Sequence, residues 1–499
     1  MRKRTSRDLD RLLTDFGTTM PRVPPPAPEP RQPRLFTQVP TPRGIRGPGN
    51  GWSPTLPPLA GYEMTSEQTP VMWPLIAGNG LPPTGAQMGV DVLTGGCFYA
   101  DPHGWVTDDD IPVTNPNIFI FGKPGRGKSG TTKIFLLRMM QFGYRALILG
   151  DLKDEYERLC RALGVEPFRI GHGLGGRINP FDIGPLGEGW EDLDPAQAKA
   201  RTDIIFARWL SLVRGLVGSQ KIGERPVPFG PSDETAITEA IRNLTGVADG
   251  NTHLREITIP ELWAALDEPT PDMLTACRYP TQDAFYSGTR NLRDSLGALC
   301  KGSLRGLFDG PTTFDPDWRS PIQSLSLNSL SKSGDEAVGL ALMCLNSWGQ
   351  GMREVADPGD RRIVLRDEAW RQTRLGVEAV KTLDSNLRLS RKEGDVQVVT
   401  YHKPSDPLSA GDAGSQAMEI AKDLLHLADI RVLLGQDQAV ADELGHLLGI
   451  SETAQRVVTG WAMQAKGRAL WMVGERMFKV QTRMTEIEKD LTYTNEAIA

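Results

Sequence analysis

A glycine-rich loop after a short apolar run constrains the fold of this chain more than any other feature of the sequence. Residues 117–121 read Asn-Ile-Phe-Ile-Phe, and the loop that follows is Gly122-Lys123-Pro124-Gly125-Arg126-Gly127-Lys128-Ser129. Its spacing is G-x-x-x-x-G-K-S, in which backbone N–H groups turn inward and surround phosphate oxygens. A strand, this loop and a helix over residues 130–142, whose positive end would face the anion, predict a nucleotide-binding site.

Each polar group of the loop has an expected partner in that nucleotide. We expect the Lys128 ammonium to lie beside the β- and γ-phosphates of ATP, and the Ser129 hydroxyl to hold Mg²⁺. Gly130, the first residue of the expected helix, is also predicted to bind the nucleotide. The alternative is a surface turn that matches the motif by chance, and the apolar runs on both sides disfavour it.

Apolar runs along the chain predict an α/β fold with a mostly parallel central sheet. The run at residues 146–149 follows the expected helix and completes a β-α-β unit. Further strand-like runs occur at residues 323–327, 362–365, 396–400 and 430–434. A hairpin is expected over residues 87–99, and the chain is expected to end with a helix near 439–448 and a second hairpin that turns at Lys466-Gly467.

Composition divides the chain into four parts. Residues 1–70 form a proline-rich, basic segment, in which residues 1–60 hold 13 prolines and 10 Lys or Arg against four acidic residues. We expect this segment to be disordered, although a tether to a membrane-bound partner or to nucleic acid is an alternative. Residues 71–186 and 321–499 are expected to form two parts of one nucleotide-binding core, and residues 187–320 a mostly helical insertion.

The overall composition excludes several classes of function. The 499 residues carry 56 Lys and Arg against 62 Asp and Glu, a net charge of −6, so a broadly basic nucleic-acid surface is not indicated. Five scattered cysteines and six histidines show no metal-binding spacing, which fits a reducing cytoplasm. No apolar run approaches the roughly 20 residues of a membrane span, and the N-terminus lacks a signal-peptide pattern. Any membrane association is therefore expected through a partner.

A second motif supplies the carboxylates that ATP hydrolysis needs. The strand-like run at residues 362–365 is followed by Arg366, Asp367 and Glu368. We expect Asp367 to complete the Mg²⁺ shell and Glu368 to polarise the attacking water. The alternative is an acidic strand end with Asp367 as the N-cap of the next helix, and the phosphate loop upstream favours the catalytic interpretation.

Asp151 and Glu155 form a competing acidic pair after the run at residues 146–149. In a parallel sheet that strand also ends near the nucleotide, so both residues are predicted to support nucleotide binding. Asp151 has a plainer alternative as the cap of the next helix. Asp367 and Glu368 are preferred because their carboxylates are adjacent, while the choice of the water-activating residue between Glu368 and Glu155 stays open.

Arg391 and Lys392 precede the expected strand at residues 396–400. In a ring of subunits, an arginine of one subunit can reach the γ-phosphate of its neighbour and add roughly 10³–10⁵ in rate. A solvated basic turn between a helix and a strand fits the same spacing equally well.

Several motifs together resemble the TraC-type, or VirB-type, conjugation ATPases of type IV secretion systems. The most specific are Arg177-Ile178-Asn179-Pro180-Phe181 and Asp367-Glu368-Ala369-Trp370. The other matches, in chain order, are Gly89-Val90-Asp91, the phosphate loop, residues 149–156, Leu307-Phe308-Asp309-Gly310, Arg391-Lys392, and His402 with Asp406. The resemblance covers about residues 70–490.

This resemblance implies a RecA-like P-loop motor, related to the FtsK/HerA translocases, that assembles as a hexameric ring. It implies ATP hydrolysis coupled to pilus assembly or substrate transfer, with membrane-bound secretion components as partners. The protein is then expected in the cytoplasm, recruited peripherally to the inner face of the cell membrane. The resemblance also favours Arg391 as a trans-acting catalytic arginine and places His402 near the nucleotide.

Three features depart from the family pattern. His402 stands where the family usually has a glutamine, which changes how the γ-phosphate would be sensed. Arg366 occupies a strand position that is normally apolar. Only the proline-rich segment precedes the motor, so the large N-terminal domain typical of the family is expected on a separate chain.

Two other functions remain open from the sequence alone. One is a DNA-pumping coupling translocase, in which DNA is a partner and stimulates the ATPase. The other is a nucleotide-binding scaffold without turnover, which the presence of Lys128, Asp367 and Glu368 disfavours.

Overall fold

The computed structural model describes residues 80–223, 225–247, 253–302, 304–313, 320–353, 359–375, 377–410 and 415–493. All of them belong to one structural unit, Ala77–Ala499. The segment predicted to be disordered, residues 1–70, lies outside the described residues.

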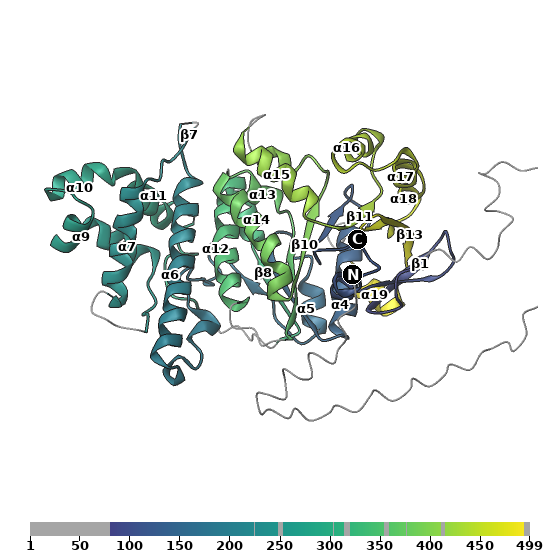
Figure 1. Ribbon diagram of the computed structural model, residues 1–499, viewed down its shortest axis with the longest axis horizontal. Coiled ribbons are helices and arrows are strands. Elements are labelled where there is room, and N and C mark those ends of the chain that lie inside the picture. Colours follow the sequence, from purple (N-terminus) through teal and green to yellow (C-terminus); the bar gives the residue numbers. More distant parts are fainter. Residues whose placement is uncertain are drawn as a thin grey trace, which may run out of the picture. The chain divides into compact units, whose positions relative to one another are not determined.

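An eleven-stranded sheet runs through the described part of the chain (Figure 1). In spatial order its strands are β2 (Cys97–Ala100), β1 (Ala86–Asp91), β13 (Arg476–Thr482), β12 (Arg468–Val473), β11 (Ile430–Leu434), β3 (Ile118–Phe121), β10 (Asp395–Tyr401), β9 (Arg361–Arg366), β4 (Tyr144–Asp151), β8 (Ile322–Ser326) and β5 (Phe168–Arg169). The seven strands from β11 to β5 are parallel, and the four from β12 to β2 are antiparallel. The predicted α/β fold with a mostly parallel sheet is therefore confirmed.

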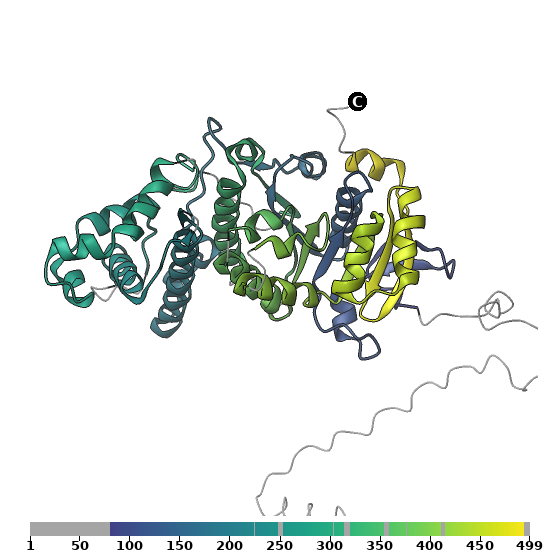
Figure 2. The same ribbon diagram turned by 90° about the horizontal axis from the view of Figure 1, so that it is seen from above.

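Strand β3 shows why the parallel strands read as continuous apolar runs. Ile118 and Ile120 pack in the core that contains helix α4 (Lys128–Met140), whereas Phe119 and Phe121 pack in the core that contains α14 (Val377–Glu393). Successive side chains point to opposite faces, and helices cover both faces (Figure 2), so each residue of the strand is buried.

The other helices of the core connect these strands or cover them. They are α3 (Pro102–Thr107), α5 (Glu157–Ala162), α12 (Asp335–Arg353), α13 (Trp370–Thr373), α15 (Gln416–His426), α16 (Gln438–Leu448), α17 (Glu452–Arg456), α18 (Ala462–Gln464) and α19 (Glu486–Thr492). Helix α4 begins earlier than the predicted residue 130, because the chain already turns into the helix at Gly127. Among the helices of the described ranges, none combines the length and apolar character needed to cross a bilayer.

The region between β5 and β8 contains a group of helices at one end of the molecule (Figure 1). They are α6 (Pro195–Gly218), α7 (Pro231–Thr245), α8 (Ile259–Asp267), α9 (Pro271–Ala276), α10 (Gln282–Gly288) and α11 (Arg290–Lys301), with a short hairpin of β6 (Lys221–Ile222) and β7 (Arg225–Pro226). Thr258, Thr270 and Thr281 each start a helix, because each side chain accepts a hydrogen bond from the N–H three residues later. The helical insertion predicted for this fold is present.

The turn of the last hairpin was predicted at the wrong place. Strands β12 and β13 pair Val473 with Arg476, so the chain reverses at Gly474-Glu475 and not at Lys466-Gly467. Gly474 has a φ of 57°, and a Cβ there would lie 2.5 Å from the Pro112 carbonyl oxygen. The positive φ and the close approach to Pro112 both require glycine at position 474, whereas Gly467 contacts Arg126 of the phosphate loop.

Helix α19 is fastened to the helix of the phosphate loop. The Arg138 guanidinium of α4 binds both carboxylate oxygens of Glu488, at 2.7 and 2.8 Å, and also donates to the Gln87 and Arg483 carbonyls. The Arg138 and Glu488 side chains are only 15% and 13% exposed. A second pair, Arg158 with Asp490, joins α5 to α19 at 2.6 Å. The C-terminal helix is therefore held over α4 and α5.

We predict that Arg138→Met loosens α19 without unfolding the sheet. Removing one partner of a largely buried pair leaves the Glu488 charge uncompensated, which costs about 2 kcal/mol or more. Hydrogen exchange should show faster exchange of the amides of α19, with β3 and β4 unchanged. Arg290→Met, which removes the exposed pair Arg290–Asp294, is the matched control and should change little. Unchanged protection of α19 in Arg138→Met would contradict the assignment.

Candidate active site

The phosphate loop lies at the carboxyl end of β3, as predicted. Its backbone passes through left-handed conformations at Gly125, with a φ of 80°, and at Gly127, with a φ of 93°. Residues with a Cβ rarely adopt such values, so the glycines allow the tight turn. The Lys123 N–H donates to the Gly435 carbonyl after β11, at 3.2 Å, which anchors the loop to the neighbouring strand. The strand, loop and helix have the arrangement that binds phosphate.

Three predicted residues of the loop shape it without lining the adjoining cavity. The Gly122 N–H donates to the Tyr401 carbonyl of β10, at 3.3 Å. The Lys123 ammonium pairs with Asp437 at 2.8 Å. The Arg126 guanidinium donates to a backbone carbonyl of the segment before β12. These contacts hold the loop against β10, β11 and β12.

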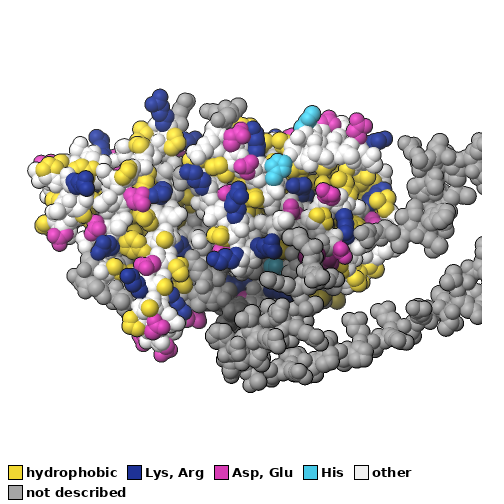
Figure 3. Space-filling view, in the orientation of Figure 1, with side chains coloured by type: hydrophobic (Ala, Val, Ile, Leu, Met, Phe, Trp, Pro, Cys, Tyr) yellow, Lys and Arg dark blue, Asp and Glu magenta, His cyan; other side chains and the backbone are white. Residues whose placement is uncertain are grey.

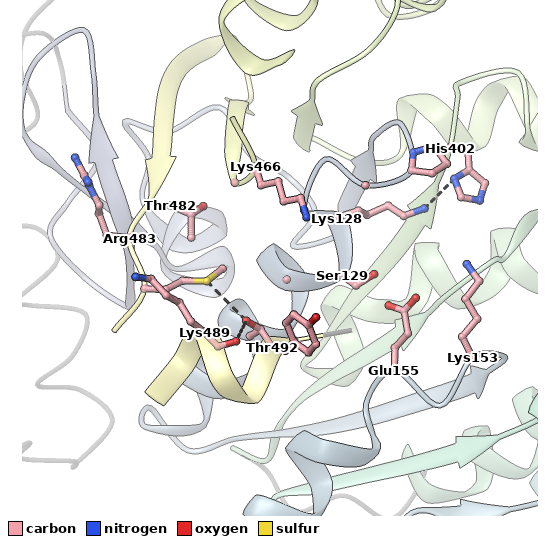
Figure 4. Close-up of a pocket in the computed structure, with 17 residues that line it drawn as sticks. Lys128, Ser129, Lys153, Glu155, His402, Lys466, Thr482, Arg483, Lys489 and Thr492 are labelled. Atoms are coloured by element: carbon pink, nitrogen blue, oxygen red, sulfur yellow. Dashed lines mark hydrogen bonds between the residues drawn. The ribbon is translucent and has the colours of Figure 1, made fainter. Parts of the chain in front are cut away.

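A cavity of about 720 Å³ opens beside the loop (Figure 4). One side is formed by the loop and by residues that follow β4 and β10; the other is formed by the segment before β12, the end of β13 and α19. Its lining includes the predicted Pro124, Gly125, Gly127, Lys128, Ser129, Gly130, Glu155 and His402. The cavity is thus built from segments that are more than 300 residues apart in the sequence.

Asp367 is buried at the end of β9, which is separated from β3 by β10. One of its carboxylate oxygens accepts hydrogen bonds from the Thr400 hydroxyl of β10 and from the Glu368 N–H, the latter at 3.1 Å. Burial raises the pKa of the Asp367 carboxyl above its ordinary value, and the nearby Lys128 ammonium opposes that effect. The Thr400 hydroxyl of the neighbouring strand β10 therefore fixes the orientation of the Asp367 carboxylate.

The Glu368 carboxylate is held by three partners. The Lys153 ammonium lies 2.9 Å from Oε1, while His402 Nε2, at 3.3 Å, and the Trp370 indole N–H both contact Oε2. Burial opposes ionisation, but the hydrogen bonds from His402 and Lys153 and the positive charge of Lys153 keep the pKa of Glu368 well below its ordinary value. The φ of Glu368 is 52°, a strained backbone conformation for a residue with a Cβ. An ionised glutamate is thus fixed at this position.

His402 connects the phosphate loop to Glu368 through both ring nitrogens. Lys128 Nζ lies 3.3 Å from Nδ1, and Nε2 lies 3.3 Å from Glu368 Oε2. An ammonium can only donate, so Nδ1 accepts and Nε2 carries the proton given to Glu368. The His402 backbone is held by Asp406, which accepts from its N–H at 2.9 Å, and by Gln436, which donates to its carbonyl at 2.8 Å.

Asp151 and Glu155 take different positions after β4. The Asp151 carboxylate accepts from the N–H groups of Lys153, Glu155 and Tyr156, at 3.2, 3.1 and 3.0 Å. Burial raises the pKa of Asp151 to about 6. Asp151 therefore caps this turn and is not part of the cavity lining. Glu155 does line the cavity, and its Oε2 is buried without a hydrogen-bond partner among the described residues.

A buried lysine that the sequence analysis did not name lies behind Glu155. Lys133 of α4 is 0% exposed, and its Nζ lies 5.5 Å from the centre of the Tyr156 ring. Burial lowers the pKa of Lys133, although the charges of Glu155 and Asp151 oppose this. Its cationic form would offset part of the acidic charge of the site.

Arg391 lies far from the cavity of its own chain. It is exposed in the last turn of α14, and its guanidinium donates to the Thr114 carbonyl at 3.2 Å. Thr114 precedes β3, whereas the phosphate loop follows it, so Arg391 lies at the opposite edge of the sheet. The seven residues of β10 separate it from His402, which corresponds to roughly 20 Å. Arg391 cannot reach the phosphate loop within one chain.

Sequence reasoning missed Thr400, Lys153 and Trp370 as parts of the site. The Trp370 position was noted only as a family match, and nothing in the local sequence indicates that its indole binds Glu368. Lys153 lies just after β4, and Thr400 lies near the end of β10. Both residues are polar, and both strands were predicted from the sequence. In a parallel sheet that position alone is a signal for a site residue.

The fold is shared with solved structures of VirB4 and of the plasmid coupling protein TrwB. No protein-family model matches the sequence, and no curated protein matches it either. VirB4 of Thermoanaerobacter pseudethanolicus is similar with a TM-score of 0.63 and 21% sequence identity, over 82% of this chain and 100% of that one. The plasmid coupling protein TrwB in complex with ADP and Mg²⁺ is similar with a TM-score of 0.50 and 13% identity, over 80% of this chain and 90% of that one. The predicted RecA-like P-loop fold is confirmed.

Proposed function

We propose that this chain is an ATP-hydrolysing motor that energises a conjugative or type IV secretion apparatus. The observation that carries the proposal is the placement of the phosphate-loop Lys128 beside a buried acidic pair, Asp367 and Glu368. Binding a nucleotide needs only the loop, whereas hydrolysis also needs carboxylates for the metal and the water. The likeness to VirB4 and to TrwB with bound ADP and Mg²⁺ supports the same class of ligand and of apparatus.

The donor set suits ATP with Mg²⁺. Ser129 offers a hydroxyl and Asp367 a carboxylate, and Mg²⁺ prefers such oxygen ligands. Bound there, the metal ion would neutralise charge on the β- and γ-phosphates. Lys128 and the backbone of Gly125–Gly130 would hold the phosphates, so the nucleoside extends toward Met484 and Tyr493 at the α19 side of the cavity.

Glu368 is our candidate for the residue that polarises the attacking water. It is ionised, as a base must be, and its three partners fix its direction. Glu155 is the runner-up, because its carboxylate lines the cavity near Ser129 and retains one oxygen without a partner among the described residues (Figure 4). Asp151 is assigned an indirect role, as the cap that sets the position of Glu155.

The proposed partners are other copies of this chain, in a ring that we expect to be a hexamer, and membrane-bound components of the apparatus. Loss of membrane association in cells that lack these components would support such recruitment.

DNA translocation is the second candidate function. The fold likeness to TrwB, a plasmid coupling protein, favours it. On the face shown in Figure 3, however, lysine and arginine side chains are interspersed with acidic and apolar ones. The described residues visible on that face form no continuous basic surface of the kind that binds nucleic acid.

We predict that Lys128→Ala lowers ATP hydrolysis by roughly 100-fold or more, because the developing phosphate charge loses its nearest cation. The rate of phosphate release, measured with and without DNA, tests this. Lys199→Ala, on the exposed surface of α6, is the control and should hydrolyse ATP like the wild type. Near wild-type turnover by Lys128→Ala would refute the ATPase assignment, and strong stimulation by DNA would favour the translocase.

We predict that Glu368→Gln retains ATP but hydrolyses it roughly 10²–10⁴ times more slowly, since an amide preserves the shape but cannot polarise water. Single-turnover measurements with labelled ATP separate binding from hydrolysis. Glu166→Gln, an exposed glutamate near the end of α5, is the control for loss of one carboxylate. If Glu155→Gln traps ATP while Glu368→Gln turns over normally, the two roles are reversed.

We predict that Arg391→Ala lowers ATPase activity only in the assembled ring, because Arg391 would act on the neighbouring subunit. Mixed rings of Arg391→Ala and Glu368→Gln subunits should regain part of the activity, since some interfaces then combine an intact Arg391 with an intact Glu368. Arg388→Ala, an exposed arginine one turn earlier that pairs with Asp384 in its own helix, is the control. Full activity of the assembled Arg391→Ala variant would exclude the trans-acting role.

A further inference from the structure

The segment that precedes β12 lies against the phosphate loop, where the sequence suggested a hairpin turn. The Gly467 N–H donates to the Arg126 carbonyl at 3.3 Å, and the Arg126 guanidinium donates to the Met463 carbonyl at 2.8 Å. On its other side, the Gly467 carbonyl accepts from the Thr482 N–H of β13 at 2.9 Å. Residues 463–467 are therefore fixed between the phosphate loop and the sheet.

Two glycines permit this close approach. A Cβ on Gly127 would lie 2.9 Å from the Gly467 nitrogen, closer than Cβ atoms approach such groups. Both residues also have left-handed backbones, with φ values of 93° and 74°. The backbone next to Lys466 is thus held at the wall of the phosphate-binding loop.

Lys466 extends its side chain from this fixed backbone toward the phosphate loop and lines the cavity (Figure 4). Its ammonium has no hydrogen bond or ion pair with any residue in the part of the chain that the structure describes. Two other lysines of the lining are already paired, Lys153 with Glu368 at 2.9 Å and Lys489 with Glu486 at 2.6 Å. Lys466 therefore brings an uncompensated positive charge to the cavity.

We propose that Lys466 is a second phosphate-binding cation of the nucleotide site, supplied by the same chain as the phosphate loop. The inference rests on the proposed nucleotide function and adds a residue that no phosphate-loop motif contains. In such a loop the lysine, here Lys128, serves the β- and γ-phosphates, while the glycine backbone surrounds the α- and β-phosphates. Lys466 lies beside that glycine backbone, so its ammonium contacts the α- and β-phosphate oxygens. It therefore strengthens the binding of ADP and ATP alike.

Replacing Lys466 by glutamine tests this assignment. Calorimetric titration of the full-length protein with ADP and with ATP, each with Mg²⁺, should give dissociation constants raised roughly tenfold for both nucleotides. Lys466→Arg should keep most of the affinity, because it keeps the charge. The affinity of Lys466→Gln should also depend less on salt than that of the wild type. The side chain is exposed and makes no polar contact with any residue in the described ranges, so the variant should fold normally.

Lys199→Gln removes a lysine charge from the exposed surface of α6 and is the matched control. Unchanged affinity of Lys466→Gln for both nucleotides would overturn the proposal, as would an equal loss in Lys199→Gln. A loss for ATP with none for ADP would place Lys466 at the γ-phosphate and would overturn the assignment as well. If the wild type bound neither nucleotide, the proposed function itself would fail, which the titration of the unmodified protein detects separately.

Discussion

Compensation of buried charge at the carboxyl ends of neighbouring parallel strands is the constraint on which the site depends. Asp367 and Glu368 are only 7% and 5% exposed. Taking an ionised carboxylate out of water costs several kcal/mol unless partners replace the lost hydration. Lys153 follows β4, His402 follows β10 and Lys128 follows β3, so the parallel order of the sheet brings the partners together. The same order gives Lys128 two partners under the proposed function, because the phosphate oxygens of a bound nucleotide would compete with His402 for its ammonium. Because the two ring nitrogens of His402 contact Lys128 and Glu368, phosphate bound at the loop would also change the surroundings of the Glu368 carboxylate.

The strands of the sheet could be predicted because each is short, apolar and buried on both faces. The runs found for β3, β4, β8, β9, β10 and β11 all correspond to strands. Their spatial order could not be predicted, since β10 and β9 lie between β3 and β4 although they come more than 200 residues later. The misplaced hairpin turn has a similar origin. Lys466-Gly467 and Gly474-Glu475 are both plausible turns locally, and only the distant contacts of Gly467 with Arg126 and of Gly474 with Pro112 distinguish them.

The site shows the same difference between features that the local sequence reveals and features that depend on distant contacts. Residues that belong to a motif with fixed spacing, such as Lys128, Ser129 and the pair Asp367 and Glu368, could be identified from the sequence. Thr400 and Lys153 carried only the weaker signal of their position at strand ends, because each contributes through a contact across strands. Arg366 was noted as an unusual charge in an apolar strand. The structure explains it: the guanidinium is buried and donates to the side-chain oxygens of Gln397, at 3.2 Å, and Asn346, so polar groups of β9, β10 and α12 bind one another.

The opposite positions of Arg391 and of the phosphate loop limit how copies of the chain could cooperate. Arg391 lies at the edge of the sheet where β10 begins, while the cavity lies at the edge where β3 and β10 end. In a two-fold contact, both subunits use the same surface. Arg391 of one subunit could then reach the cavity of the other only if that one surface contained both Arg391 and the cavity. A head-to-tail contact joins unlike surfaces, and when its rotation closes it forms a ring. The proposal that Arg391 acts in trans therefore requires the same head-to-tail geometry as the ring expected from the family resemblance. One geometric requirement thus connects the two proposals, so evidence against a head-to-tail interface would count against both.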